Sequence, residues 1–145
     1  MEYRKIESDF IKRTLSIIEE YSGDNEVTLL INCCIGLLVL PKEKYKNLPK
    51  SSSDSDYNVW GLSKDNIQFG SIEYRNYKIS NIIRRMRNGV SHFNIVTLPN
   101  GSGNISTLKI SDKDPRNSAN TFSIEIQIEN LKHFLTKLAN HVLDV

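Results

Sequence analysis

The chain has 145 residues, and its 19 Lys and Arg nearly balance its 17 Asp and Glu. This length can bury one sizeable hydrophobic core but not two, so a single domain over residues 1–145 is predicted. A net charge of +2 does not by itself indicate nucleic-acid binding, which depends on local clustering of cations. The composition therefore excludes a second domain and leaves the functional evidence to local patterns.

Neither membrane insertion nor export is expected from the sequence. The strongest apolar run, residues 27–40, is shorter than the roughly 20 residues that span a bilayer. The charged segment Met1–Lys5 is not followed by the apolar core of a signal peptide. Cys33 and Cys34 are adjacent, and neighbouring cysteines do not easily meet disulfide geometry. We therefore expect reduced core thiols in a cytoplasmic protein with no membrane contact.

The N-terminal part of the chain predicts two helices from the spacing of its apolar residues. The first is expected from about Tyr3 to Tyr21. Asp24 is the expected N-cap of a second helix, which runs to Leu40 and ends before Pro41. Since this second helix is apolar almost all round, we expect neighbouring elements to cover it on several sides.

Residues 42–74 lack such periodicity, and a long polar loop is predicted there. The tract Ser51–Asp56 at its centre has too little apolar surface to order itself. Tyr57, Trp60 and Phe69 are the expected attachments of this loop to the core. Loops of this length are often functional, so a lid over a cleft is an alternative role.

The second half of the chain combines helices with strands. A third helix is predicted over about residues 77–93 and a last one over about 129–143. Between them, residues 95–127 alternate in polarity on both sides of a glycine-rich turn, which predicts a small antiparallel sheet. The third helix has one apolar stripe, comprising Ile79, Ile82, Ile83, Met86, Val90 and Phe93. The expected fold class is α+β, mainly helical.

The polar face of the third helix carries the densest group of reactive side chains. Arg87 and His92 project about 140° apart on an ideal helix, with Arg84, Asn88 and Ser91 between them. A guanidinium binds a phosphate bidentately, and an imidazole exchanges protons near neutral pH. These are the minimum groups for cutting RNA. An alternative is a solvated face whose arginines complement the helix dipole.

The wide angle between Arg87 and His92 predicts a partner for this helix. A second copy packed against the first would complete a phosphate site, which indicates a symmetric dimer. Gly89 supports this interpretation, because a glycine inside a helix often marks the close approach of another backbone. From the same helix geometry, Arg84, Arg85 and Ser91 are candidates for substrate contact. His133 and His141 lack further ligands at a spacing typical of zinc sites, so no metal site is predicted.

The segment Arg87-Asn88-Gly89-Val90-Ser91-His92 resembles the signature of the HEPN family, the higher eukaryotes and prokaryotes nucleotide-binding domains. That signature is Arg followed after four to six residues by His, commonly with a polar residue straight after the Arg. Here four residues intervene, and Asn88 is the polar residue straight after the Arg. The resemblance implies a HEPN-like four-helix bundle, with the strands at about 95–127 as an insertion before the last helix.

The resemblance also implies an activity, namely a metal-independent endoribonuclease that acts on RNA as a homodimer without a cofactor. Arg87 and His92 of both subunits would line one cleft, with Asn88 orienting the pair. His92 would move the proton of the ribose 2'-hydroxyl, and Arg87 would hold the charge of the phosphorane. The implied setting is a toxin or anti-phage defence effector, with an antitoxin protein as a further candidate partner.

Two alternatives remain open at this point. One is a non-catalytic HEPN module that binds nucleotide, RNA or a regulatory partner through the same basic face. The other is a structural dimerisation domain. The nuclease requires both Arg87 and His92, the binding module tolerates loss of His92, and the structural domain tolerates exchange of either residue.

Overall fold

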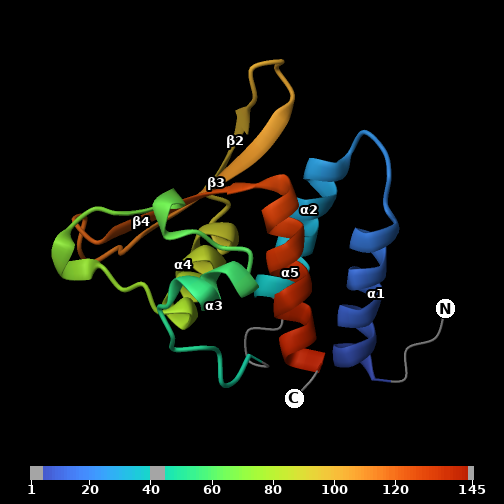
Figure 1. Ribbon diagram of the computed structural model, residues 1–145, viewed down its shortest axis with the longest axis horizontal. Coiled ribbons are helices and arrows are strands. Elements are labelled where there is room, and N and C mark those ends of the chain that lie inside the picture. The colour runs from blue at the N-terminus through green and yellow to red at the C-terminus, as the bar shows by residue number, and fades with distance from the viewer. Residues whose placement is uncertain (1–4, 40–44, 144–145) are drawn as a thin grey trace.

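The structure is a computed structural model that describes residues 5–39 and 45–143. Helices cover one face of a sheet (Figure 1). The helices are α1 (Ile6–Glu20), α2 (Glu26–Cys34), α3 (Asp54–Val59), α4 (Ile79–Ser91) and α5 (Ile128–Leu143), and a π-helical segment, Ile35–Val39, continues α2. The strands are β1 (Ile67–Phe69), β2 (Ile95–Pro99), β3 (Ile105–Lys113) and β4 (Thr121–Gln127). The predicted α+β class is confirmed.

The strands form one antiparallel sheet in the order β1-β4-β3-β2. Ile124 of β4 lies opposite Ile110 of β3 on one side and Ile67 of β1 on the other. Alternate residues of β3 and β4 are buried under the helices, while those between them face outward. In Figure 1 the far end of the β2–β3 hairpin projects beyond the helices. The sheet thus has one covered face and one open face.

Helix α4 lies between the π-helical segment and strand β3, and it packs on both. Five of the six predicted stripe residues are at most 2% exposed, namely Ile79, Ile82, Ile83, Met86 and Val90. Phe93, the sixth, is 64% exposed because α4 ends at Ser91, before it. Helices α1, α2 and α5 pack on one another. Because α4 also packs on the sheet, the four-helix bundle stays a prediction.

The predicted polar loop at 42–74 is wrong for its described part, residues 45–74, which contains α3 and β1. Ser53 is the N-cap of α3, and its hydroxyl accepts a hydrogen bond from the Asp56 amide at 3.2 Å. The polar tract predicted not to order itself therefore contains the start of a helix. Tyr57 and Trp60 are 1% and 3% exposed, which confirms them as attachments to the core. Because β1 pairs with β4, the sheet extends beyond the predicted insertion at 95–127.

We expect Ser53→Ala to lower the free energy of unfolding by about 0.5–2 kcal/mol, because the first turn of α3 loses its cap. The hydroxyls of Ser51 and Ser53 also lower the pKa of Asp56. The ionised carboxylate thus stabilises the fold above its unfolded pKa, and that contribution is lost as pH falls through its folded value. Urea denaturation at neutral and acidic pH should show a smaller difference in acid. Ser52→Ala, which removes no cap, is the control, and equal midpoints for the two variants would contradict the capping role.

The described residues also test the helix ends and the cysteines. The N-cap of α2 is Asn25, one residue after the predicted Asp24. The predicted helix limits at Tyr3 and at Leu40–Pro41 lie outside the described residues. Cys33 and Cys34 are buried and unpaired, and burial raises the pKa of the Cys34 thiol to about 12, as expected of core thiols. No helix in the described ranges is long and apolar enough to cross a bilayer.

Candidate functional site

His92 follows the last residue of α4 and is held there by backbone hydrogen bonds. Its own amide donates to the Asn88 carbonyl at 3.1 Å. The Phe93 amide donates to the Val90 carbonyl at 3.0 Å, and the Asn94 amide donates to the Gly89 carbonyl at 2.8 Å. This pair of bonds is a Schellman motif, the common helix end in which one residue adopts a left-handed backbone. The exposed imidazole of His92 therefore projects from a fixed point of the backbone.

Phe93 is the left-handed residue of this helix end, with a φ of +55°. Glycine usually occupies such a position, because a side chain there costs roughly 1–2 kcal/mol. The Asn94 carbonyl then accepts a hydrogen bond from the Ser111 amide at 3.0 Å, which ties the helix end to β3. The strained residue beside His92 is thus an exposed aromatic rather than a glycine.

Arg87 lies one turn before the end of α4, on the side toward Tyr45. Arg87 is half-buried, and it is close enough to Tyr45 to affect the ionisation of its hydroxyl. Burial raises the pKa of Tyr45, and the Arg87 charge opposes that shift. The Tyr45 hydroxyl donates to the Leu37 carbonyl in the π-helical segment. Arg87 therefore lies on the side of α4 that faces Tyr45 and the π-helical segment.

Arg85, predicted to contact substrate, is a buried residue that forms an ion pair with Asp112. The residue is 3% exposed, and its Nε lies 2.5 Å from Oδ2 of Asp112 on β3. Nη1 donates to Oδ1 of Asn120 at 2.9 Å, and the guanidinium lies 5.6 Å from the centre of the Phe122 ring. The physical reason is that Asp112 occupies a buried position of its strand and requires a cation there.

Asn88 shares the carboxylate that binds Arg85. Its Nδ2 donates to Oδ2 of Asp112 at 3.4 Å, so the amide nitrogen faces β3. The structure thus places Asn88 on the β3 side of α4 and Arg87 on the Tyr45 side. Within one copy of the chain, these two predicted site residues lie on different sides of the helix.

Gly89 marks a close approach, as predicted, but the approaching backbone belongs to the same chain. A Cβ at Gly89 would lie 2.6 Å from the Ser111 carbonyl oxygen and 2.6 Å from Cγ2 of Ile110. The glycine therefore lets α4 pack directly on β3. Gly89 therefore gives no support to a dimer, because the backbone that approaches it is that of β3 in the same chain.

Gly89→Ala should accordingly destabilise the protein, although alanine is the better helix former by about 1 kcal/mol. Overpacking against a backbone that cannot move aside costs about 1–3 kcal/mol, so the expected net change is a loss. The midpoint of urea denaturation measures it. Gly101→Ala is the control, since nothing lies within 4 Å of a Cβ at that position. A more stable Gly89→Ala protein would show that β3 leaves room for a methyl group at this position.

The remaining predicted residues of α4, Arg84 and Ser91, are both solvent-exposed. Nη2 of Arg84 donates to Oδ1 of Asn81 at 2.7 Å, one turn earlier on the helix. Ser91 is the last residue of α4, next to His92. Both side chains are therefore accessible to a large ligand, unlike that of Arg85.

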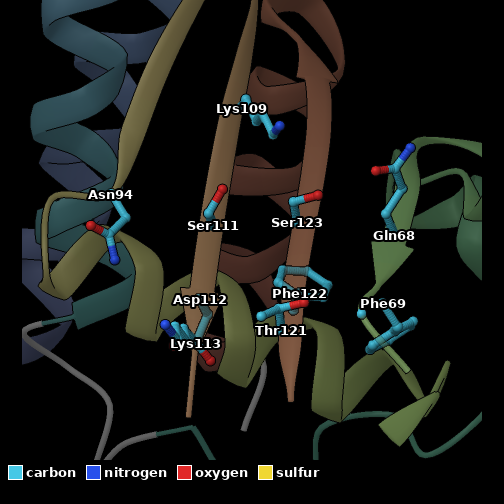
Figure 2. Close-up of a pocket in the computed structure, with 11 residues that line it drawn as sticks. Gln68, Phe69, Asn94, Lys109, Ser111, Asp112, Lys113, Thr121, Phe122 and Ser123 are labelled. Carbon is cyan, nitrogen blue, oxygen red and sulfur yellow. The ribbon is translucent and has the colours of Figure 1, made fainter. Parts of the chain in front are cut away.

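A shallow hollow of about 280 Å³ lies on the open face of the sheet, where the helices are behind the strands (Figure 2). Lys109 and Ser111 of β3 and Ser123 of β4 line it, together with Asn94, which follows the helix end. None of the predicted site residues lines this hollow. The hollow therefore begins near the chain segment that carries His92 but does not contain the motif.

Sequence reasoning missed Asp112, Asn120 and Tyr45. A usable signal existed for Asp112, because strand alternation puts it on the same face as Leu108 and Ile110. An acid at such a position predicts a buried cation partner. No comparable signal existed for Tyr45 or Asn120, whose contacts depend on how distant segments fold together. Across the described ranges, no group of three or more His, Cys, Asp or Glu side chains could hold a metal ion.

Comparison with protein families identifies a match over the whole chain. A family model described as HEPN pEK499 p136 matches residues 1–145, the whole chain. No curated protein and no solved structure shows significant similarity to this chain.

Proposed function

The chain belongs to the HEPN pEK499 p136 family, and from that premise we propose that it is a metal-independent endoribonuclease whose active site is shared by two copies of the chain. In this proposal α1, α2, α4 and α5 correspond to the four-helix bundle of HEPN domains, and the sheet is an addition to it. The proposed setting is the cytoplasm, where the protein acts as a toxin or anti-phage defence effector and an antitoxin protein is a further partner.

One observation carries the proposal, namely an exposed histidine on a rigid helix end, next to exposed apolar side chains. His92 is fixed by the helix-end hydrogen bonds, Phe93, the next residue, is 64% exposed, and Val96 on β2 is 55% exposed. Apolar side chains that remain exposed around a polar site favour a protein partner there. A left-handed aromatic residue is also strained, and such strain is concentrated at functional sites.

The dimer supplies what one copy lacks. Arg87 and Asn88 lie on different sides of α4, and Arg87 and His92 are about 140° apart around the helix axis. A symmetric pair of α4 helices would place the Arg87 of one copy near the His92 of the other. Each residue would then act on the same phosphate from opposite sides of one cleft.

The proposed reaction is an internal transesterification. The ribose 2'-hydroxyl attacks the adjacent phosphorus, the bond from phosphorus to the 5'-oxygen breaks, and a 2',3'-cyclic phosphate forms. His92 takes the proton of the 2'-hydroxyl or returns one to the 5'-oxygen, and Arg87 stabilises the negative charge of the phosphorane. Asn88, whose amide nitrogen is engaged by Asp112, is a positioning residue. Arg84 and Ser91 contact the neighbouring RNA.

The test is incubation of the purified chain with a mixed RNA pool in excess chelator. We expect fragments that end in a cyclic phosphate and begin with a 5'-hydroxyl. A substrate with 2'-deoxyribose at a cleaved position should stay intact at that position, because it lacks the nucleophile. Absence of RNA cleavage would overturn the proposal, as would cleavage at the deoxyribose. A monomer in light scattering at micromolar concentration would contradict the shared site.

A further inference from the structure

A second polar cavity, of about 460 Å³, lies beside the N-terminal half of α4. Its walls come from the segment before α4, from α4 itself and from the loop between β3 and β4. The principal lining residues are Tyr74, Arg75, Lys78, Asn81, Arg84 and Asn120. Arg87 and His92 are not among the residues that line this cavity.

The cavity has an excess of positive charge. Arg75, Lys78 and Arg84 line it with exposed side chains, and Glu73 is the carboxylate that lines it. Arg85 also contributes to the wall, but Asp112 neutralises its charge. Neither Arg75 nor Lys78 forms an ion pair with any residue in the described part of the chain. Their charges therefore remain available to an anionic ligand.

Side-chain amides hold the cavity wall in shape. Asn81 is 9% exposed, its Nδ2 donates to the Asn76 carbonyl at 2.8 Å, and its Oδ1 accepts from Nη2 of Arg84 at 2.7 Å. Asn120 accepts from Nη1 of Arg85 at 2.9 Å. The guanidinium of Arg84 is thus oriented by a side chain that is itself fixed, and a preorganised guanidinium suits bidentate recognition of a phosphate.

We propose that this cavity binds a phosphate group of single-stranded RNA, away from the phosphate that is cut. The position relative to the cut rests on the proposed function, whereas the phosphate chemistry does not. Arg84 precedes His92 by eight residues, which is about 12 Å along a helix. At about 3.4 Å per nucleotide of a stacked strand, that distance spans roughly three or four phosphates. The cavity would therefore anchor the strand and set how long a substrate must be.

The test measures binding without cleavage. The probe is a fluorescent single-stranded RNA of about 12 nucleotides, long enough to reach both sites at this spacing, titrated by anisotropy into His92→Ala protein in chelator. Arg75→Gln and Lys78→Gln, each added to that background, should weaken binding roughly threefold to tenfold at low salt. Each should also reduce the slope of log Kd against log salt by about one. Lys12→Gln, which removes an exposed charge from α1, is the matched control and should change neither quantity by as much.

A second titration, with adenosine monophosphate, separates the two sources of such a phosphate. Weakened RNA binding with a reduced salt slope supports the RNA assignment. Unchanged RNA binding with weakened nucleotide binding would overturn it, because the cavity would then hold a free nucleotide. No change for either probe would overturn the site altogether. If the wild-type chain cuts no RNA but the variants bind it less tightly, the proposed nuclease function fails and the phosphate site stands.

Discussion

His92→Ala protein is expected to cleave RNA about 10² to 10⁴ times more slowly than the wild type, the usual effect of losing a general acid or base. Its stability should hardly change, because the imidazole is exposed and the backbone hydrogen bonds of the helix end do not involve it. Initial rates on one cleaved RNA, with thermal melting by circular dichroism, measure both quantities. His133→Ala, which removes another exposed imidazole, is the control.

A mixed dimer makes this prediction specific to a shared site. If Arg87 of one copy works with His92 of the other, chains carrying Arg87→Ala and chains carrying His92→Ala should complement each other. Refolding the two variants together should then give much faster cleavage than either variant alone. A mixture as slow as its components would show that both residues act within one copy, and rates for His92→Ala equal to those of the wild type would remove His92 from the mechanism.

Asp112→Ala should cause the largest loss of stability of the substitutions considered, about 3–5 kcal/mol, because it leaves the buried Arg85 charge without its partner. Asp112 and Arg85 are 7% and 3% exposed, so water cannot replace the lost carboxylate. The same substitution removes the oxygen that accepts a hydrogen bond from the Asn88 side-chain amide. We therefore expect slower RNA cleavage in the protein that remains folded. Guanidinium denaturation and initial rates at low temperature measure the two effects.

The double variant Arg85→Met, Asp112→Leu distinguishes a charge effect from a packing effect. Since replacing a buried ion pair by apolar residues is often neutral or stabilising, the double variant should recover much of the lost stability. Cleavage should stay impaired, because Asn88 still lacks its partner. Asp65→Ala, at an exposed acid, is the control for removing a carboxylate. Equal stability of Asp112→Ala and Asp65→Ala would show that the ion pair contributes nothing.

The sequence was sufficient for the elements with strong periodicity. The isoleucines of α4 recur at helical spacing, and those of β4 alternate, so local patterns alone predicted both elements. The sequence could not show which of two neighbouring arginines would be buried. Arg84 and Arg85 differ by about 100° around the helix, and the burial of Arg85 depends on Asp112, which is distant in the chain.

The short elements escaped prediction for a related reason. Strand β1 has three residues and is ordered by pairing with β4, so its own sequence carries little signal. Gly89 gives the opposite lesson. A glycine inside a helix correctly predicted a close contact, but it does not identify which backbone approaches.

The pairing of β1 with β4 also orders the events of folding. The β2–β3 and β3–β4 pairs join strands that are neighbours in the sequence. In contrast, Ile67 of β1 pairs with Ile124 of β4, and the chain between them includes α4. Closing such a long loop is entropically unfavourable until the intervening elements have formed. The segment that follows β1 carries Arg75 and Lys78, so their cavity is completed only when that strand docks. A newly made chain would thus acquire most of its helical structure before the cavity lined by Arg75 and Lys78 forms.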